Sequence, residues 1–350
     1  MAVLQRSLLR FRFHLLEFRN LNSSCTPLLF QEFISVRRMA TGTPGNKFPH
    51  DLKGFGYGFN EDGRLRKLDK VTGQPGEEGF EFQVSNDGDY NQRHYEALGD
   101  VITEHVYDLL ETEVGLVRLP VPVVPEHPST FIFATPNALT SDSPLMVLIH
   151  GSGVVRAGQW ARSLIINDCL QSGTQIPYIK KAREKGYEVM VLNSNENAKV
   201  IKGKRVPIKG SGSSPAHVSY VWRHYIQGAK SDRVLIVAHS YGGQCTVELA
   251  KEMFPSFKSK VVAVAMTDSV HRLSTKNAQE KYAKFLSQVG RNWVSSDKKL
   301  DEPESTRGGD IDWVSAGTMK HEMTSWSCIE SVFAFFEESL QRGKVVHSDL

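Results

Sequence analysis

A serine at position 240 lies in a turn between an apolar run and a segment of helical composition. The run Val234–Ala238 is mostly β-branched, which predicts a buried parallel strand. A strand, a tight turn that carries a serine, and a helix together form the nucleophile elbow of serine hydrolases. Strand and helix cross closely at such an elbow, so small residues are needed two before and two after the serine. Ala238 and Gly242 fill those positions, and Ser240 is therefore the candidate nucleophile.

Two later residues could activate this serine. A serine hydroxyl is a weak nucleophile at neutral pH and needs a histidine base that a carboxylate orients. On this type of scaffold the chain order is serine, acid, histidine. Asp268 follows the apolar run 261–266, and His321 lies in the loop after the last predicted strand at 312–316. We expect Ser240, Asp268 and His321 to form a catalytic triad.

The acid and the base each have a competitor in the sequence. Asp297 and Asp301 could supply the acid, but Asp268 comes directly from a more strongly predicted strand. His271 could act as the base in place of His321, although it lies only three residues from Asp268, an unusual arrangement for this fold.

A second loop could supply backbone amides for the reaction. Acyl transfer requires two N–H groups that face the developing oxyanion. One is expected from Tyr241, next after the nucleophile. The other is expected from His150–Gly153, which follows the apolar run 145–149 and is close to the His-Gly-Gly-Gly loop of lipases and esterases. Because glycine lets the backbone turn its amides inward, we expect Gly151, Ser152 and Tyr241 to form the oxyanion hole.

No metal or cofactor is expected at this site. The four cysteines are widely spaced, and no cysteine or histidine cluster has the spacing of a zinc site. Serine hydrolysis itself requires no cofactor.

The elements around these residues alternate between strand and helix patterns. Strands are predicted from apolar runs at 131–133, 145–149, 188–192, 233–238, 261–266 and 312–316. Helices are predicted over roughly 175–185, 216–228, 242–254, 276–289 and 325–338. This alternation predicts an α/β-hydrolase-like fold, with a mainly parallel sheet and helices on both faces. Sites in such folds form at the carboxyl ends of the strands.

The sequence predicts four further divisions of the chain. Residues 1–50 are an arginine-rich leader and linker, expected to be disordered, and 51–130 are an N-terminal extension packed on the core. The extension contains a small hairpin and an amphipathic helix over 91–112. The hydrolase-like core spans 131–340, and within it 199–214 is expected to be a flexible basic loop.

Positive charge is concentrated in two segments of the chain. Residues 1–40 hold six arginines, no lysine and two glutamates, a composition that suggests a mitochondrial transit peptide. The second place is the basic loop 199–214. Direct nucleic-acid binding is disfavoured, because the chain beyond the leader is close to neutral although the net charge is +3. No apolar run approaches the roughly 20 residues that a transmembrane helix needs.

Several longer motifs are distinctive: Leu145–Arg162, Ser172–Pro177, Val237–Gly243, Thr267–His271, Asn292–Ser296, Ser315–Gly317, His321–Glu322 and Thr324–Trp326. Together they resemble the argonaute-binding Arb-two domain family, most closely its animal branch of cotranscriptional regulators, over about Leu52–Phe336. The resemblance implies an α/β-hydrolase-like fold with its serine at Ser240.

The resemblance also implies a biological role. It implies a protein of the nucleus and cytoplasm that supports argonaute proteins and chromatin-remodelling or splicing factors, in alternative splicing or in small-RNA-linked gene silencing. The alternative, which rests on the residues alone, is an active serine esterase, thioesterase or amidase that uses Ser240, Asp268 and His321. The leader would place that alternative in the mitochondrion.

Overall fold

The computed structural model describes residues 48–124, 126–273, 280–306 and 310–348. The arginine-rich segment 1–47, and with it the expected transit peptide, lies outside the described residues. Within them, none of the helices is long and apolar enough to cross a bilayer.

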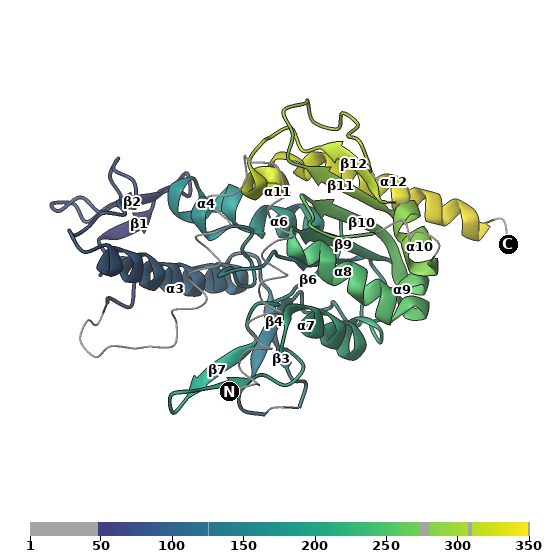
Figure 1. Ribbon diagram of the computed structural model, residues 1–350, viewed down its shortest axis with the longest axis horizontal. Coiled ribbons are helices and arrows are strands. Elements are labelled where there is room, and N and C mark those ends of the chain that lie inside the picture. The colour runs from purple at the N-terminus through teal and green to yellow at the C-terminus, as the bar shows by residue number, and fades with distance from the viewer. Residues whose placement is uncertain (1–47, 125, 274–279, 307–309, 349–350) are drawn as a thin grey trace, which may run out of the picture. The chain divides into compact units, whose positions relative to one another are not determined.

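A sheet of eight strands forms the centre of the described chain, in the order β12-β11-β10-β9-β5-β6-β4-β3 (Figure 1). The six strands β12, β11, β10, β9, β5 and β6 pair in parallel with their neighbours. Strand β4 pairs antiparallel with β6, and β3 pairs antiparallel with β4. The predicted α/β-hydrolase-like fold with a mainly parallel sheet is confirmed. The strands are β3 (Val117–Val121), β4 (Thr130–Ala134), β5 (Leu145–Ile149), β6 (Glu188–Val191), β9 (Val234–His239), β10 (Val261–Thr267), β11 (Gly290–Val294) and β12 (Asp312–Ser315).

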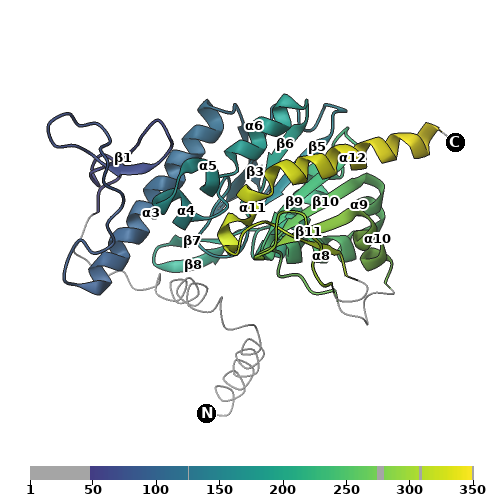
Figure 2. The same ribbon diagram turned by 90° about the horizontal axis from the view of Figure 1, so that it is seen from above.

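Helices cover both faces of this sheet because its inner strands are apolar on both sides. In β9, Leu235 and Val237 pack into one core cluster, and Val234 and Ile236 pack into the other. The first cluster includes residues of α3 (Gly88–Thr112), α6 (Ile176–Glu184) and α12 (Ile329–Ser348). The second includes residues of α7 (Ser214–Val221), α8 (Tyr241–Glu252), α9 (Phe254–Lys260) and α10 (Lys281–Val289). Figure 2 shows α6 and α12 on one side of the sheet, and α8 and α10 on the other.

The chain before the sheet forms a hairpin and a long helix. Strands β1 (Tyr57–Phe59) and β2 (Leu65–Lys67) pair antiparallel, as the sequence predicts. Helix α3 begins after Asp87, whose carboxylate accepts hydrogen bonds from Asp89 N and Tyr90 N and so caps the helix. Short helices complete the chain: α4 (Arg162–Asn167), α5 (Leu170–Gly173), a π-helical turn (Trp222–Ile226), a 3-10 turn (His321–Met323) and α11 (Thr324–Ser327).

The segments 199–214 and 290–294 differ from their predicted structure. Where the sequence predicts a flexible loop over 199–214, β7 (Ala198–Ile201) and β8 (Lys204–Pro207) form an antiparallel hairpin. Its turn, Lys202-Gly203, has positive φ at both residues, the geometry of a two-residue hairpin turn, but lacks the asparagine or aspartate that usually marks one. Strand β11 is a strand that the apolar pattern does not predict, because it carries Arg291 and a buried Asn292.

Candidate active site

Ser240 lies on a sharp turn between β9 and α8. Its φ of 51° and ψ of −118° are unusual for a residue with a side chain and store backbone strain. The surrounding backbone holds this conformation: Ser240 N donates to Thr267 O at 3.0 Å, and Val270 N donates to Ser240 O at 3.2 Å. A strained serine at the junction of strand and helix is the geometry of a nucleophile elbow.

Two glycines after the serine are required by close packing. A Cβ atom at Gly242 would lie 2.6 Å from the Ile149 carbonyl oxygen, and one at Gly243 would lie 1.8 Å from Ser269 Oγ. Both distances are below van der Waals contact, so only glycine lets α8 cross the ends of β5 and β10 at this depth.

The loops after β10 and β12 bring an acid and a base together. His321 Nδ1 lies 2.7 Å from Asp268 Oδ2, and Asp268 Oδ1 accepts a hydrogen bond from Ser295 N at 3.1 Å. Burial acts to raise the pKa of Asp268, but the hydrogen bond and charge of His321 and the Ser295 amide outweigh it, so the pKa lies below its usual value. The carboxylate is thus ionised at neutral pH and holds the Nδ1–H of His321.

The ring of His321 lies beside the elbow. Its centroid is 4.8 Å from that of His239, the residue before Ser240. Within the described part of the chain, no hydrogen bond joins the Ser240 hydroxyl to the His321 ring. Catalytic hydrogen bonds are often long in free enzymes and tighten when substrate binds, so this arrangement is compatible with a base acting on Ser240.

The competing acid and base candidates are engaged elsewhere. His271 Nε2 lies 2.9 Å from Asp310 Oδ1, and its Nδ1 lies 2.8 Å from Ser269 Oγ. Asp301 accepts hydrogen bonds from Trp293 Nε1 at 2.7 Å and from Ser331 Oγ at 2.6 Å.

The remaining acid candidate, Asp297, lies in the loop after β11 and is exposed. Of the candidate acids, the structure therefore brings Asp268 to His321, and neither Asp297 nor Asp301.

The loop after β5 passes directly beside the serine. A Cβ atom at Gly151 would lie 3.0 Å from Ser240 Cβ and 3.5 Å from Ser240 Oγ. Ser152 is exposed and follows Gly151 in this loop, while Tyr241 is the first residue of α8. The N–H groups at a helix N-terminus have no partner within the helix and favour negative charge. The residues of the expected oxyanion hole are thus grouped around Ser240.

Other histidines near the elbow are neutral. Burial lowers the pKa of His150 to about 4 and that of His239 to about 3. The His239 ring is held by the hydroxyls of Thr267 and Ser325, at 3.2 Å and 3.3 Å. These histidines therefore shape the site without carrying charge at neutral pH.

Sequence reasoning missed two groups that hold the site. The Ser295 amide follows β11, a strand that the apolar pattern does not predict. Asn195 follows β6 and donates hydrogen bonds to the loop beside Ser240; an asparagine after a strand is otherwise an ordinary loop residue. In the described residues, no group of three or more histidine, cysteine or carboxylate side chains is placed to hold a metal ion.

Comparison with known proteins identifies the family. A sequence model of the Arb2 domain matches residues 48–300. The "Cotranscriptional regulator ARB2A homolog" of Xenopus tropicalis is 40% identical over 355 residues, which cover 87% of this chain and 83% of that protein. The "Cotranscriptional regulator ARB2A" of Homo sapiens is 40% identical over 352 residues, which cover 86% of this chain and 83% of that protein.

Among solved structures, a histone deacetylase from Saccharomyces cerevisiae is similar with a TM-score of 0.47 and 14% identity, covering 70% of this chain and 98% of that one. A likeness at this level bears on neither activity nor partners. The resemblance read from the sequence motifs is confirmed by the family match and the 40% identity. On that basis, this chain belongs to the Arb2 domain family.

Proposed function

We propose that this protein is a cotranscriptional regulator. The observation that supports this most strongly is the 40% identity to a protein named a cotranscriptional regulator, over 87% of the chain. The motif resemblance extends the proposal to its setting: a protein of the nucleus and cytoplasm that works with argonaute proteins and with chromatin and splicing factors.

Affinity purification from separated nuclear and cytosolic extracts tests this role. We expect argonaute proteins to be enriched with the tagged full chain from the nuclear extract, relative to a tag-only control. The absence of enrichment from both extracts would contradict the proposed partnership. Ser240→Ala, purified in parallel, should retain argonaute if the partnership needs the scaffold and not the serine chemistry.

We infer a second function, serine hydrolysis, from the site itself. The observation that supports it is the 2.7 Å contact between Asp268 and His321 beside a serine on a strained elbow. Among serine hydrolases this arrangement acts on esters, thioesters or amides.

The reaction would follow from the positions of these groups. Ser240 Oγ attacks the substrate carbonyl while its proton passes to His321 Nε2, and Asp268 stabilises the imidazolium that forms. The carbonyl oxygen, now an oxyanion, accepts hydrogen bonds from the backbone N–H groups of Ser152 and Tyr241. The bond between the carbonyl carbon and the leaving group then breaks as His321 gives its proton to that group, which leaves the acyl group on Ser240 Oγ. Water next attacks the acyl-enzyme while His321 takes its proton, and the bond to Ser240 Oγ breaks as His321 returns that proton to the serine.

A fluorophosphonate probe, which reacts with activated serines, tests this second function. We expect the probe to label the wild-type chain and not Ser240→Ala. Ser269→Ala is the matched control, because Ser269 also lies within hydrogen-bond distance of a histidine, His271, but lacks the elbow. No labelling of the folded wild-type chain would contradict hydrolase activity and leave the regulatory proposal intact.

A further inference from the structure

The loop beside the nucleophile, residues 150–157, is held from outside by an asparagine. Asn195 Nδ2 donates to Gly151 O at 2.9 Å and to Val155 O at 3.2 Å. Its Oδ1 accepts from Ser214 Oγ at 3.1 Å. Carbonyl oxygens only accept hydrogen bonds, so the NH₂ of Asn195 must face the loop, and its orientation is fixed by its partners.

These contacts also fix the direction of one backbone amide. Gly151 O receives a second hydrogen bond from His150 Nδ1, at 2.8 Å. In a trans peptide the carbonyl oxygen and the following N–H point in opposite directions. Holding Gly151 O toward Asn195 therefore turns the Ser152 N–H to the other side of the loop. Within the described residues, no hydrogen bond uses the Ser152 N–H, so it remains available to a ligand.

The protonation state of His150 agrees with this arrangement. Because burial lowers its pKa to about 4, the ring is neutral at physiological pH and carries one N–H. The bond to Gly151 O requires that hydrogen to be on Nδ1. Two donors, from His150 and Asn195, thus converge on the same carbonyl.

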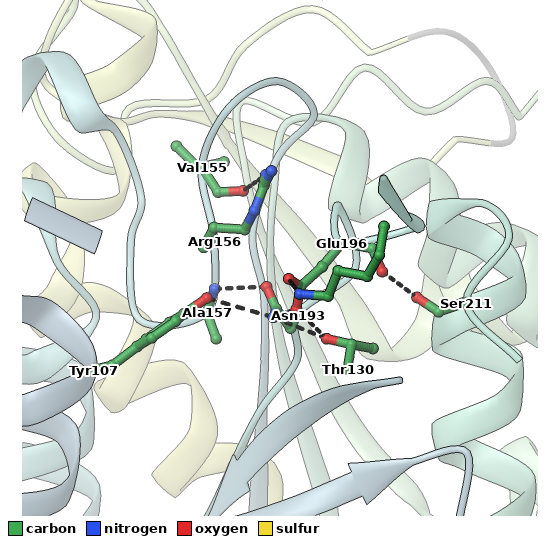
Figure 3. A network of polar contacts seen from close by, with 9 residues as sticks. Tyr107, Thr130, Val155, Arg156, Ala157, Asn193, Glu196 and Ser211 are labelled. Atoms are coloured by element: carbon green, nitrogen blue, oxygen red, sulfur yellow. Dashed lines mark hydrogen bonds and ion pairs between the residues drawn. The ribbon is translucent and has the colours of Figure 1, made fainter. Parts of the chain in front are cut away.

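A second asparagine holds the far end of the loop (Figure 3). Asn193 Oδ1 accepts from Ala157 N at 3.1 Å, and its Nδ2 donates to Glu196 Oε2 at 3.0 Å. Glu196 also accepts hydrogen bonds from the hydroxyl of Thr130 and from the ammonium of Lys199. An ionised carboxylate only accepts, so Glu196 fixes which side of the Asn193 amide faces Ala157.

We propose that Asn195 is a positioning residue, which directs the Ser152 N–H toward the oxyanion by holding the Gly151 carbonyl, while Asn193 fixes the far end of the same loop. The proposal rests on the hydrolase activity inferred above. It assigns the donor capacity of the Asn195 amide, and not its volume, as the property that the site needs.

Three variants separate the effect of the Asn195 donor from the effect of its volume. Asn195→Ala removes the donor and the volume, whereas Asn195→Asp keeps the volume but places a carboxylate, which cannot donate, against two carbonyl oxygens. Asn197→Ala is the matched control, because Asn197 Nδ2 also donates to two carbonyls, those of Ser194 and Ser211, but touches no residue of 150–157 by hydrogen bonding.

Two measurements are made on the full chain. The first is the rate of fluorophosphonate labelling, resolved into probe affinity and the rate constant of the bound step. We expect both Asn195 variants to lower that rate constant about 10²-fold with little change in affinity, the usual effect of losing one oxyanion donor. The second is amide hydrogen exchange, in which both variants should speed exchange in peptides covering 150–157 by about 10-fold. Asn197→Ala should change neither quantity.

The outcomes distinguish the two proposals. If both Asn195 variants label and exchange at the wild-type rates, the inference is overturned. If Asn195→Ala is defective but Asn195→Asp behaves like the wild type, the site needs the volume of the side chain and not its donor, which also overturns the inference. If the wild-type chain is not labelled, the hydrolase proposal fails. The exchange measurement then still decides whether Asn195 holds the loop. Should Asn195→Ala not fold, Asn195→Asp carries the same comparison.

Discussion

Replacing Asp268 with asparagine should disable the base while leaving the fold in place. Ser295 N donates to Asp268 Oδ1 at 3.1 Å, so an asparagine must keep its carbonyl oxygen at that position. Its NH₂ then faces the Nδ1 of His321, which lies 2.7 Å from the present Oδ2. A donor there forces Nδ1 to accept and moves the ring hydrogen to Nε2, which can no longer take the Ser240 proton.

The expected loss of labelling is large. A histidine locked in the wrong tautomer costs about 10³–10⁴-fold in rate, which corresponds to about 4–5 kcal/mol of transition-state stabilisation. The backbone should tolerate the change, because Asp268 has a positive φ of 46° and asparagine adopts that region readily. The assay is the second-order rate of fluorophosphonate labelling of the purified full chain at neutral pH.

Asp301→Asn is the control for this substitution. Asp301 also has a positive φ, 67°, and also accepts two hydrogen bonds, from Trp293 and Ser331, but it does not contact His321. We expect Asp301→Asn to label at close to the wild-type rate. Equal labelling of Asp268→Asn and wild type would refute the assignment of Asp268 as the orienting acid.

Three further outcomes are expected. Gly242→Ala should lower the free energy of unfolding by about 1–3 kcal/mol in urea titrations, because its Cβ would lie 2.6 Å from Ile149 O; unchanged stability would refute the close crossing. Trp293→Ala should cost about 3–5 kcal/mol in the same measurement, since the side chain is fully buried, and a cost under 1 kcal/mol would contradict that burial. Burial lowers the pKa of His217 to about 3 from 6.5, so unfolding takes up a proton between these values. The contribution of His217 to the free energy of unfolding is therefore complete above pH 6.5. On acidification below that pH, the free energy of unfolding falls by up to about 1.4 kcal/mol per pH unit because of this group, and urea titrations of His217→Gln at several pH values should show a smaller slope.

Much of the site follows from local sequence patterns. The elbow is predictable because a five-residue apolar strand, small flanking residues and a helix all occur within one short stretch. Asp268 and His321 are placed by chain order, since the carboxyl ends of parallel strands meet at one edge of the sheet. Each was predicted from the strand that precedes it in the chain, β10 for Asp268 and β12 for His321.

The supporting contacts could not be read in the same way. Strand β11 carries arginine and asparagine, so its pattern does not indicate a strand, and the Ser295 amide that follows it could not be placed. Asn195 acts on Gly151, which is 44 positions away in the chain, and only the pairing of β5 with β6 brings them together. The hairpin of β7 and β8 was not predicted, because its Lys202-Gly203 turn lacks the asparagine or aspartate that usually marks such a turn.

The most direct test of an activated Ser240 in this Arb2 domain is peptide mapping after fluorophosphonate treatment. The folded full chain is treated with the probe, digested, and the adduct located by mass spectrometry. We predict a single adduct, on Ser240. An adduct on Ser269, which lies 2.8 Å from the imidazole of His271, or no adduct on a folded chain, would contradict the assignment of Ser240 as the nucleophile.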